Sequence, residues 1–136
     1  MAEEKNLFDI EIICPDRIFY SGKAFMVEYN TTEGQIGVYK NHVPVTNVIA
    51  PGIVTITDEN EKRIVAAVHS GFATILQDKV TLLAEIAEWP DEIDEQRAKA
   101  AKERAEKRLS ENREELDVLR AEIALKKALV RLEVKN

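Results

Sequence analysis

The first part of the chain alternates between apolar and polar positions over short segments. In Phe8–Ile12, single acidic residues separate the apolar ones, which is the period of a strand with one buried face. Turn residues follow at Glu33-Gly34, Pro51-Gly52 and Gln77-Asp78. Further strands are predicted at residues 22–29, 53–57, 63–69, 72–76 and 80–86, with additional turns at 58–60 and 70–71. Turns about every ten residues favour a sandwich or barrel, because the connections are too short for crossover helices.

The last part of the chain repeats apolar residues at helical spacing. Pro90 and the acidic residues after it suit a helix start. Small and apolar residues then form a stripe on one face of this first helix: Ala98, Ala101, Ala105 and Leu109. Ser110–Asn112 is the predicted break. On the second helix, larger apolar residues form one face (Leu116, Leu119, Ile123, Val130), with Val118, Ala121, Leu125 and Leu132 beside them. So short a break predicts an antiparallel helical hairpin. Its alanine stripe buries little area, so the hairpin alone is expected to be only marginally stable.

Composition divides the chain at Trp89-Pro90. Every glycine, proline and aromatic residue lies at or before position 90. The net charge of −6 also lies in that part, while residues 91–136 carry equal numbers of acidic and basic groups. The predicted fold is therefore α+β in two parts: an N-terminal antiparallel β-sandwich over residues 1–88 and a C-terminal antiparallel α-helical hairpin over residues 91–136. Trp89, at the joint, is expected either in a docking seam between the two parts or as a plug of the sandwich core.

Charge and chemistry exclude several classes of function. An acidic chain does not suit a nucleic-acid partner. With Cys14 alone, no internal disulfide forms, and a reduced compartment is expected. The acidic start has no apolar core and no apolar run approaches about 20 residues, so neither a signal peptide nor a membrane span is expected. No nucleophile, phosphate-loop or metal motif appears. His42 is expected to bond backbone in a turn, and His69 to be partly buried in a strand.

Three segments resemble the epsilon subunit family of F-type ATP synthases. They are EGQIGVYKNHVPV (33–45), SGFATILQDKVTLLAE (70–85), and IDEQRA (93–98) with LRAEIALKKALVRL (119–132). The resemblance implies a non-catalytic subunit of the rotating central stalk, with the gamma subunit and the c-ring as partners. It implies that the hairpin either docks on the sandwich or extends toward the alpha/beta head, where it inhibits ATP hydrolysis. It also implies a peripheral location on the cytoplasmic face of the bacterial membrane, reached only through partners.

The family likeness assigns two candidate sites. A c-ring contact is implied at the Gly-x-x-Gly loop and the histidine after it: Glu33, Gly34, Gln35, Gly37 and His42. Gln35 replaces an acidic residue common in the family, so a polar contact is expected there rather than an ionic one. The alternative for the two glycines is a tight turn with no partner.

The second site lies on the hairpin, where several bacterial members bind ATP as a regulatory ligand; no cofactor is required. The residues at the matching positions are Glu88, Ile93, Asp94, Arg97, Ala98, Lys127 and Arg131. A carboxylate suits an adenine amino group and guanidinium groups suit phosphates. Lys127 replaces an arginine of some members and lacks its planar fork. The alternative is a set of solvated, salt-bridging surface residues.

Two other functions compete with this interpretation. An adaptor made of a sandwich and a helical tail fits the composition equally well and loses only to the ordered motifs. An enzyme with an unfamiliar site is opposed by the lack of a catalytic constellation. The sequence does not distinguish proton from sodium coupling, because the ion site lies in other subunits.

Overall fold

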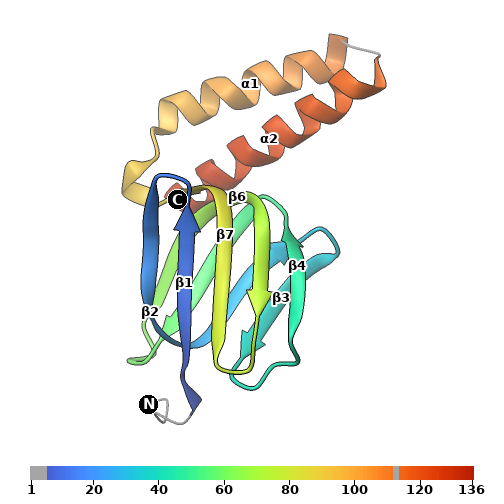
Figure 1. Cartoon of the computed structure of the whole chain (residues 1–136). Coiled ribbons are helices and arrows are strands. Elements are labelled where there is room, and N and C mark those ends of the chain that lie inside the picture. The colour runs from blue at the N-terminus through green and yellow to red at the C-terminus, as the bar shows by residue number, and fades with distance from the viewer. Residues whose placement is uncertain (1–5, 112–113) are drawn as a thin grey trace.

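A sandwich of strands carries two helices beyond one of its ends (Figure 1). The computed structural model describes residues 6–111 and 114–136. The strands are β1 (Phe8–Cys14), β2 (Arg17–Thr31), β3 (Gly34–Tyr39), β4 (Val45–Ile49), β5 (Gly52–Asp58), β6 (Arg63–Ile75) and β7 (Lys79–Glu88). A 3-10 turn, η2 (Pro90–Glu92), leads to helices α1 (Glu95–Glu111) and α2 (Glu115–Lys135). The predicted α+β class, sandwich then helical hairpin, is confirmed.

The long strands β2 and β6 change partners along their length, which wraps the strands around one core. β2 pairs first with β1 and then with β3 and β5, while β6 pairs first with β5 and then with β4. All of these pairings are antiparallel, as predicted, but β1 also lies parallel to β7. That one parallel pair places the first and last strands side by side, which local alternation along the chain does not reveal.

The predicted turn at Ser70-Gly71 is wrong, because β6 runs through it without a break. Both residues have positive φ, 56° and 140°, yet the pairing with β7 keeps one register on either side. A Cβ at Gly71 would lie 2.0 Å from the carbonyl oxygen of Leu83. Glycine therefore serves here to let two strands approach closely at a bend, not to reverse the chain.

The predicted loop after Glu33 is also wrong, since Gly34–Tyr39 forms β3 at the edge of the sheet, where β2 is its one partner among the described strands. Of its two glycines, Gly34 has a positive φ of 124°, whereas Gly37 does not. β4 was missed as well. Both strands carry a single buried residue, Val38 in β3 and Ile49 in β4, so neither shows a clear alternation.

Large apolar side chains from all seven strands fill the core of the sandwich. Those that are fully buried include Tyr29, Phe8, Ile10, Ile12, Ile56, Ile75, Leu82, Val27, Val38, Val54 and Val68. The Tyr29 hydroxyl donates to Asn47 Oδ1 at 3.0 Å, and burial raises its pKa to about 12. The sandwich therefore has a self-contained core to which no described residue of either helix contributes.

The two helices meet through alanines. Ala98 and Ala105 of α1 are buried, as are Ala121 and Ala128 of α2, each pair seven residues apart. The predicted stripe on α1 is thus confirmed at its first and third members. On α2, however, the predicted face is exposed at Leu116, Leu119 and Ile123, and only its fourth member, Val130, is buried. The helices approach so closely along the alanines that the larger side chains are left outside. α1 continues through Ser110 to Glu111, later than predicted, and Asn112 lies outside the described residues.

The hairpin contacts the sandwich chiefly through α2, which lies nearer the strands than α1 (Figure 1). The apolar part of this contact, here called the docking seam, consists of Ala67, Ile93, Val130 and Val134, with Ile53 at its edge. Lys135 adds a hydrogen bond from Nζ to the carbonyl oxygen of Pro90 at 3.0 Å. The seam is small beside the core of the sandwich, so docking is held by few side chains.

Candidate functional site

A polar pocket of about 340 Å³ opens where the sandwich, the 3-10 turn and both helices meet. This junction pocket is lined by Glu88, Glu92, Ile93, Asp94, Arg97, Ala98, Ala101, Arg104 and Arg131. Six of the seven residues predicted for a ligand site are among them. The seventh, Lys127, lies one helical turn before Arg131 on α2 and does not line the pocket. The fold thus gathers residues that are up to 43 positions apart, such as Glu88 and Arg131.

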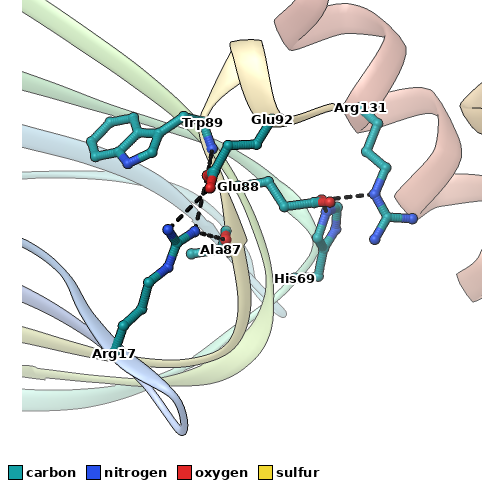
Figure 2. A network of polar contacts seen from close by, with 7 residues as sticks. All are labelled: Arg17, His69, Ala87, Glu88, Trp89, Glu92 and Arg131. Carbon is teal, nitrogen blue, oxygen red and sulfur yellow. Dashed lines mark hydrogen bonds and ion pairs between the residues drawn. The ribbon is translucent and has the colours of Figure 1, made fainter. Parts of the chain in front are cut away.

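Glu88 ends β7 and links the sandwich to the hairpin (Figure 2). Its Oε1 atom accepts a hydrogen bond from His69 Nε2 at 3.1 Å and another from Arg131 Nε at 2.7 Å. The hydrogen bond from His69, followed by that from Arg131, lowers the pKa of the Glu88 carboxyl to about 2. Glu88 is therefore a fixed carboxylate at neutral pH, with both donors directed at one of its two oxygens.

Asp94 caps the start of α1. Its Oδ1 accepts a hydrogen bond from the backbone N–H of Arg97 at 3.1 Å, and its carbonyl accepts from the N–H of Ala98 at 3.0 Å. This is the ordinary role of aspartate before a helix, and it fixes the carboxylate at the rim of the pocket. The helix begins after Asp94 rather than at Pro90 as predicted, because Pro90–Glu92 forms the separate turn η2.

The basic side chains of the pocket come from both helices. Arg97 and Arg104 are seven residues apart on α1, about 10 Å along its axis and on one face. Arg131 of α2 uses its Nε for Glu88, and its terminal nitrogens point away from that carboxylate (Figure 2). Arg104, which was not predicted, lines the pocket, whereas Lys127 does not. The i, i+7 spacing from Arg97 was the signal that could have found Arg104.

Glu92 was missed by the sequence analysis, and it is held by the sandwich. Arg17 donates from both terminal nitrogens to its carboxylate at 2.9 and 3.0 Å, and the Trp89 backbone N–H donates at 2.9 Å (Figure 2). These hydrogen bonds, that from Arg17 first, lower the pKa of Glu92. Trp89 stacks on Phe19 with ring centroids 4.1 Å apart and packs against the sandwich core. The linker is therefore fastened to the sandwich as far as Glu92.

The residues predicted for a c-ring contact follow one edge of the sandwich. Glu33 lies in the turn before β3, Gly34, Gln35 and Gly37 lie within β3, and His42 follows it. β3 spans roughly 17 Å. Gln35 lies near α2, in a groove that it shares with Lys126 and Glu133. At the other end, Asn41 donates its N–H to the carbonyl of Gln77 in the β6–β7 connection, and His42 bonds the carbonyl of Val43 through Nδ1 at 2.7 Å, as expected for a turn histidine.

His69 differs most from expectation, because it is fully buried rather than partly buried (0% exposed). Among the described residues, no three His, Cys, Asp or Glu side chains are grouped so as to hold a metal ion. Within the same ranges, 6–111 and 114–136, no helix has the length and hydropathy to cross a bilayer.

Comparison with known proteins places the chain among rotary ATPase subunits. Residues 7–90 match the family "ATP synthase, Delta/Epsilon chain, beta-sandwich domain", and residues 91–136 match the family "ATP synthase, Delta/Epsilon chain, long alpha-helix domain". The ATP synthase epsilon chain of Ruminiclostridium cellulolyticum is 42% identical over 129 residues, covering 95% of this chain and 96% of that one. The epsilon chain of Brevibacillus brevis is 49% identical over 108 residues, or 79% of this chain and 82% of that one.

A solved structure has the same fold. A chain of the Euglena gracilis mitochondrial ATP synthase, in a structure of its OSCP/F1/c-ring, superposes with a TM-score of 0.80 at 25% identity. The match covers 93% of this chain and 79% of that one.

Proposed function

The chain belongs to the delta/epsilon chain family of ATP synthases, whose members are non-catalytic accessory subunits, and on that premise we propose that it is a rotor subunit whose hairpin inhibits ATP hydrolysis and docks when ATP is bound. The observation that carries the proposal is the junction pocket. Its wall includes Glu88 of the sandwich, Arg97 of α1 and Arg131 of α2. Only a folded and docked hairpin brings these three together, so a ligand in the pocket favours the docked state.

The charges of the pocket suit a nucleoside triphosphate. Carboxylates lie at the end nearest the linker (Glu88, Asp94), where they accept from the amino group of an adenine ring. Guanidinium groups line the pocket as well, at Arg97 and Arg104 of α1 and at Arg131 of α2 beside Glu88, where they can bind phosphates. Ala98 and Ala101 leave room between them for a flat ring. The proposed role of ATP is that of a ligand that stabilises the docked hairpin.

Two surfaces of the sandwich suit the stalk partners. An apolar hollow of about 650 Å³ includes Val48, Phe72 and Leu83. Phe72 is 55% exposed and Leu83 49% exposed, so this face suits a large apolar partner, for which we propose the gamma subunit. The β3 edge, with Glu33, Gln35 and His42, is the proposed c-ring contact. The extended hairpin would reach the alpha/beta head, and the subunit would sit peripherally on the cytoplasmic face of a bacterial membrane.

Calorimetry on the isolated full-length chain tests the ligand. Arg97→Ala should weaken ATP binding about tenfold or more, because it removes a charge-assisted contact to phosphate. Arg108→Ala is the matched control on the same helix: Arg108 is exposed and does not line the pocket. Binding that is absent at millimolar ATP, or equally weakened by both variants, would refute the pocket as the site.

Reconstitution tests the inhibition. A chain ending at Glu92 keeps the linker that Arg17 and Phe19 hold on the sandwich. In a complex with gamma and the alpha/beta head, this chain should bind gamma as the full chain does and should allow faster ATP hydrolysis. Equal or slower hydrolysis would remove the inhibitory role from the hairpin, and failure of the full chain to copurify with gamma would remove the stalk assignment.

A further inference from the structure

His69 is a buried polar side chain whose role the stalk function does not explain. It lies on β6, and its ring is fully enclosed. Within the described residues its Nδ1 atom has no hydrogen-bond partner, and its Nε2 atom bonds Glu88 Oε1 at 3.1 Å. A carboxylate only accepts, so in this contact the Nε2 atom is the donor. Burying an imidazole costs free energy, and the one polar contact that offsets it is to a carboxylate of the junction pocket.

The strand register brings this pair together. β6 and β7 are antiparallel, with His69 opposite Ile86 and Ala67 opposite Glu88. His69 and Glu88 are therefore diagonal neighbours on one face, within reach of long side chains. The imidazole approaches the carboxylate from the sandwich, while Arg131 approaches it from α2 (Figure 2).

The two donors together leave the carboxylate with a defined free acceptor. Both bonds end on Oε1, and no hydrogen bond within residues 6–111 and 114–136 engages Oε2. Glu88 lines the pocket, so this second oxygen is the one available to a ligand. Arg131 alone would hold the carboxylate through a long side chain that also moves with the hairpin. His69, enclosed in the sandwich, cannot move with it.

We propose that His69 is a positioning residue for ligand recognition: it fixes the Glu88 carboxylate so that Oε2 selects a purine with a 6-amino group over one with a 6-oxo group. This inference rests on the proposed function. An amino group at that place donates to Oε2, whereas a carbonyl oxygen there faces a carboxylate with no proton between them. The hydrogen bond from His69 also keeps the carboxyl ionised, since it is the largest cause of the low pKa of Glu88.

Paired titrations with ATP and ITP test the assignment, because the two ligands share the ribose and the triphosphate and differ at purine position 6. The full-length chain should prefer ATP by about tenfold or more, as expected for one charge-assisted hydrogen bond. His69→Leu keeps the apolar volume and removes the donor, so this preference should fall to within about threefold. His69→Gln restores a donor and should recover part of the preference. Arg97→Ala should weaken ATP and ITP by the same factor.

The ratio of two affinities does not depend on how much of a variant is folded, so a destabilised His69→Leu still gives an answer. Nitrogen-15 spectra of the imidazole provide a second measurement: they should show a proton on Nε2, the atom that donates to Glu88. An unchanged ATP-to-ITP ratio in His69→Leu would overturn the role of His69 while leaving the ATP site in place. A wild-type chain that binds both nucleotides equally would do the same. A wild-type chain that binds neither would overturn the proposed site together with this inference.

Discussion

The sandwich and the hairpin are built from opposite kinds of side chain. The sandwich encloses large residues such as Tyr29, Ile56 and Leu82, contributed by strands distant in the sequence. The hairpin is held by alanines, Ala98 and Ala105 among them, and its larger leucines lie outside the helix contact. A buried leucine or isoleucine contributes about 1.5–3 kcal/mol, and an alanine far less. The sandwich is thus held by a large apolar core, while the contact between the two helices contributes little free energy.

The junction between them is where a weak ligand, such as the one proposed, would have most effect. The docking seam contains only a few apolar side chains, including Ile93, Val130 and Val134. A ligand at ten times its dissociation constant adds about 1.4 kcal/mol to the state that binds it. That shifts a nearly balanced two-state element about tenfold, although it would be negligible against the core of the sandwich.

The largest effect should come from the core of the sandwich. Leu82→Ala removes a fully buried side chain and should lower the free energy of unfolding by about 2–5 kcal/mol. Leu83→Ala is the matched control, because the next residue of β7 faces outward and is 49% exposed. Its cost should stay below about 0.5 kcal/mol. Chemical denaturation followed by circular dichroism measures both, and similar losses would contradict the division between a core and an outer face.

The second effect concerns the polar contact across the junction. The pKa of Glu88 is about 2 in the folded protein, below its ordinary value of 4.5, so the ionised carboxylate stabilises the folded form. That stabilisation, roughly 3 kcal/mol, is present above about pH 5 and is lost as the pH falls toward 2. The difference in unfolding free energy between the wild type and Glu88→Gln should therefore shrink over this window. A difference that is constant from pH 7 to pH 3 would mean that Glu88 is not held by His69 and Arg131.

How much of the fold the sequence predicts also differs from one region to another. Alternation identifies strands whose outer faces are polar, as in Phe8–Ile12. It fails for β4, where Val45 and Val48 face outward although they are apolar, and for β3, whose glycines leave no pattern. An apolar outer face is what the proposed partner surface would require, and it removes the alternation by which a strand is recognised.

For the candidate site, the residues that share one face of a single helix were predictable. The register of one helix or strand against its neighbour was not. Helical spacing places Arg97 and Ala98 on one face of α1. The choice between Arg104 and Lys127 depends on how far one helix slides along the other, and alanine stripes do not specify that distance. His69 required the register of β6 against β7, which pairs residues about 19 positions apart.

A third effect should separate the hairpin from the sandwich. Ala105→Leu places a large side chain into the close contact of α1 with α2 and should destabilise the hairpin by about 1–3 kcal/mol. Ala100→Leu, at an exposed position of the same helix, should leave its stability nearly unchanged. Hydrogen exchange should show faster exchange of helical amides in Ala105→Leu, with the strands still protected. Loss of protection in both regions would show that the two parts unfold as one unit.

The smallest effect should be seen at Trp89, although it stands at the joint. Its ring stacks on Phe19 of β2, and Arg17 holds the following turn through Glu92. Trp89 therefore belongs to the sandwich, and a hairpin that moves should pivot after Glu92. Tryptophan emission should then be nearly the same in the full chain, in the full chain with saturating ATP, and in the chain ending at Glu92. Phe19→Ala, which removes the stacked ring, should shift the emission toward that of a more exposed indole. A saturable shift with ATP in the wild type that is lost in Arg97→Ala would place the pivot at Trp89 instead. The mobile region would then include residues that the contacts assign to the fixed sandwich.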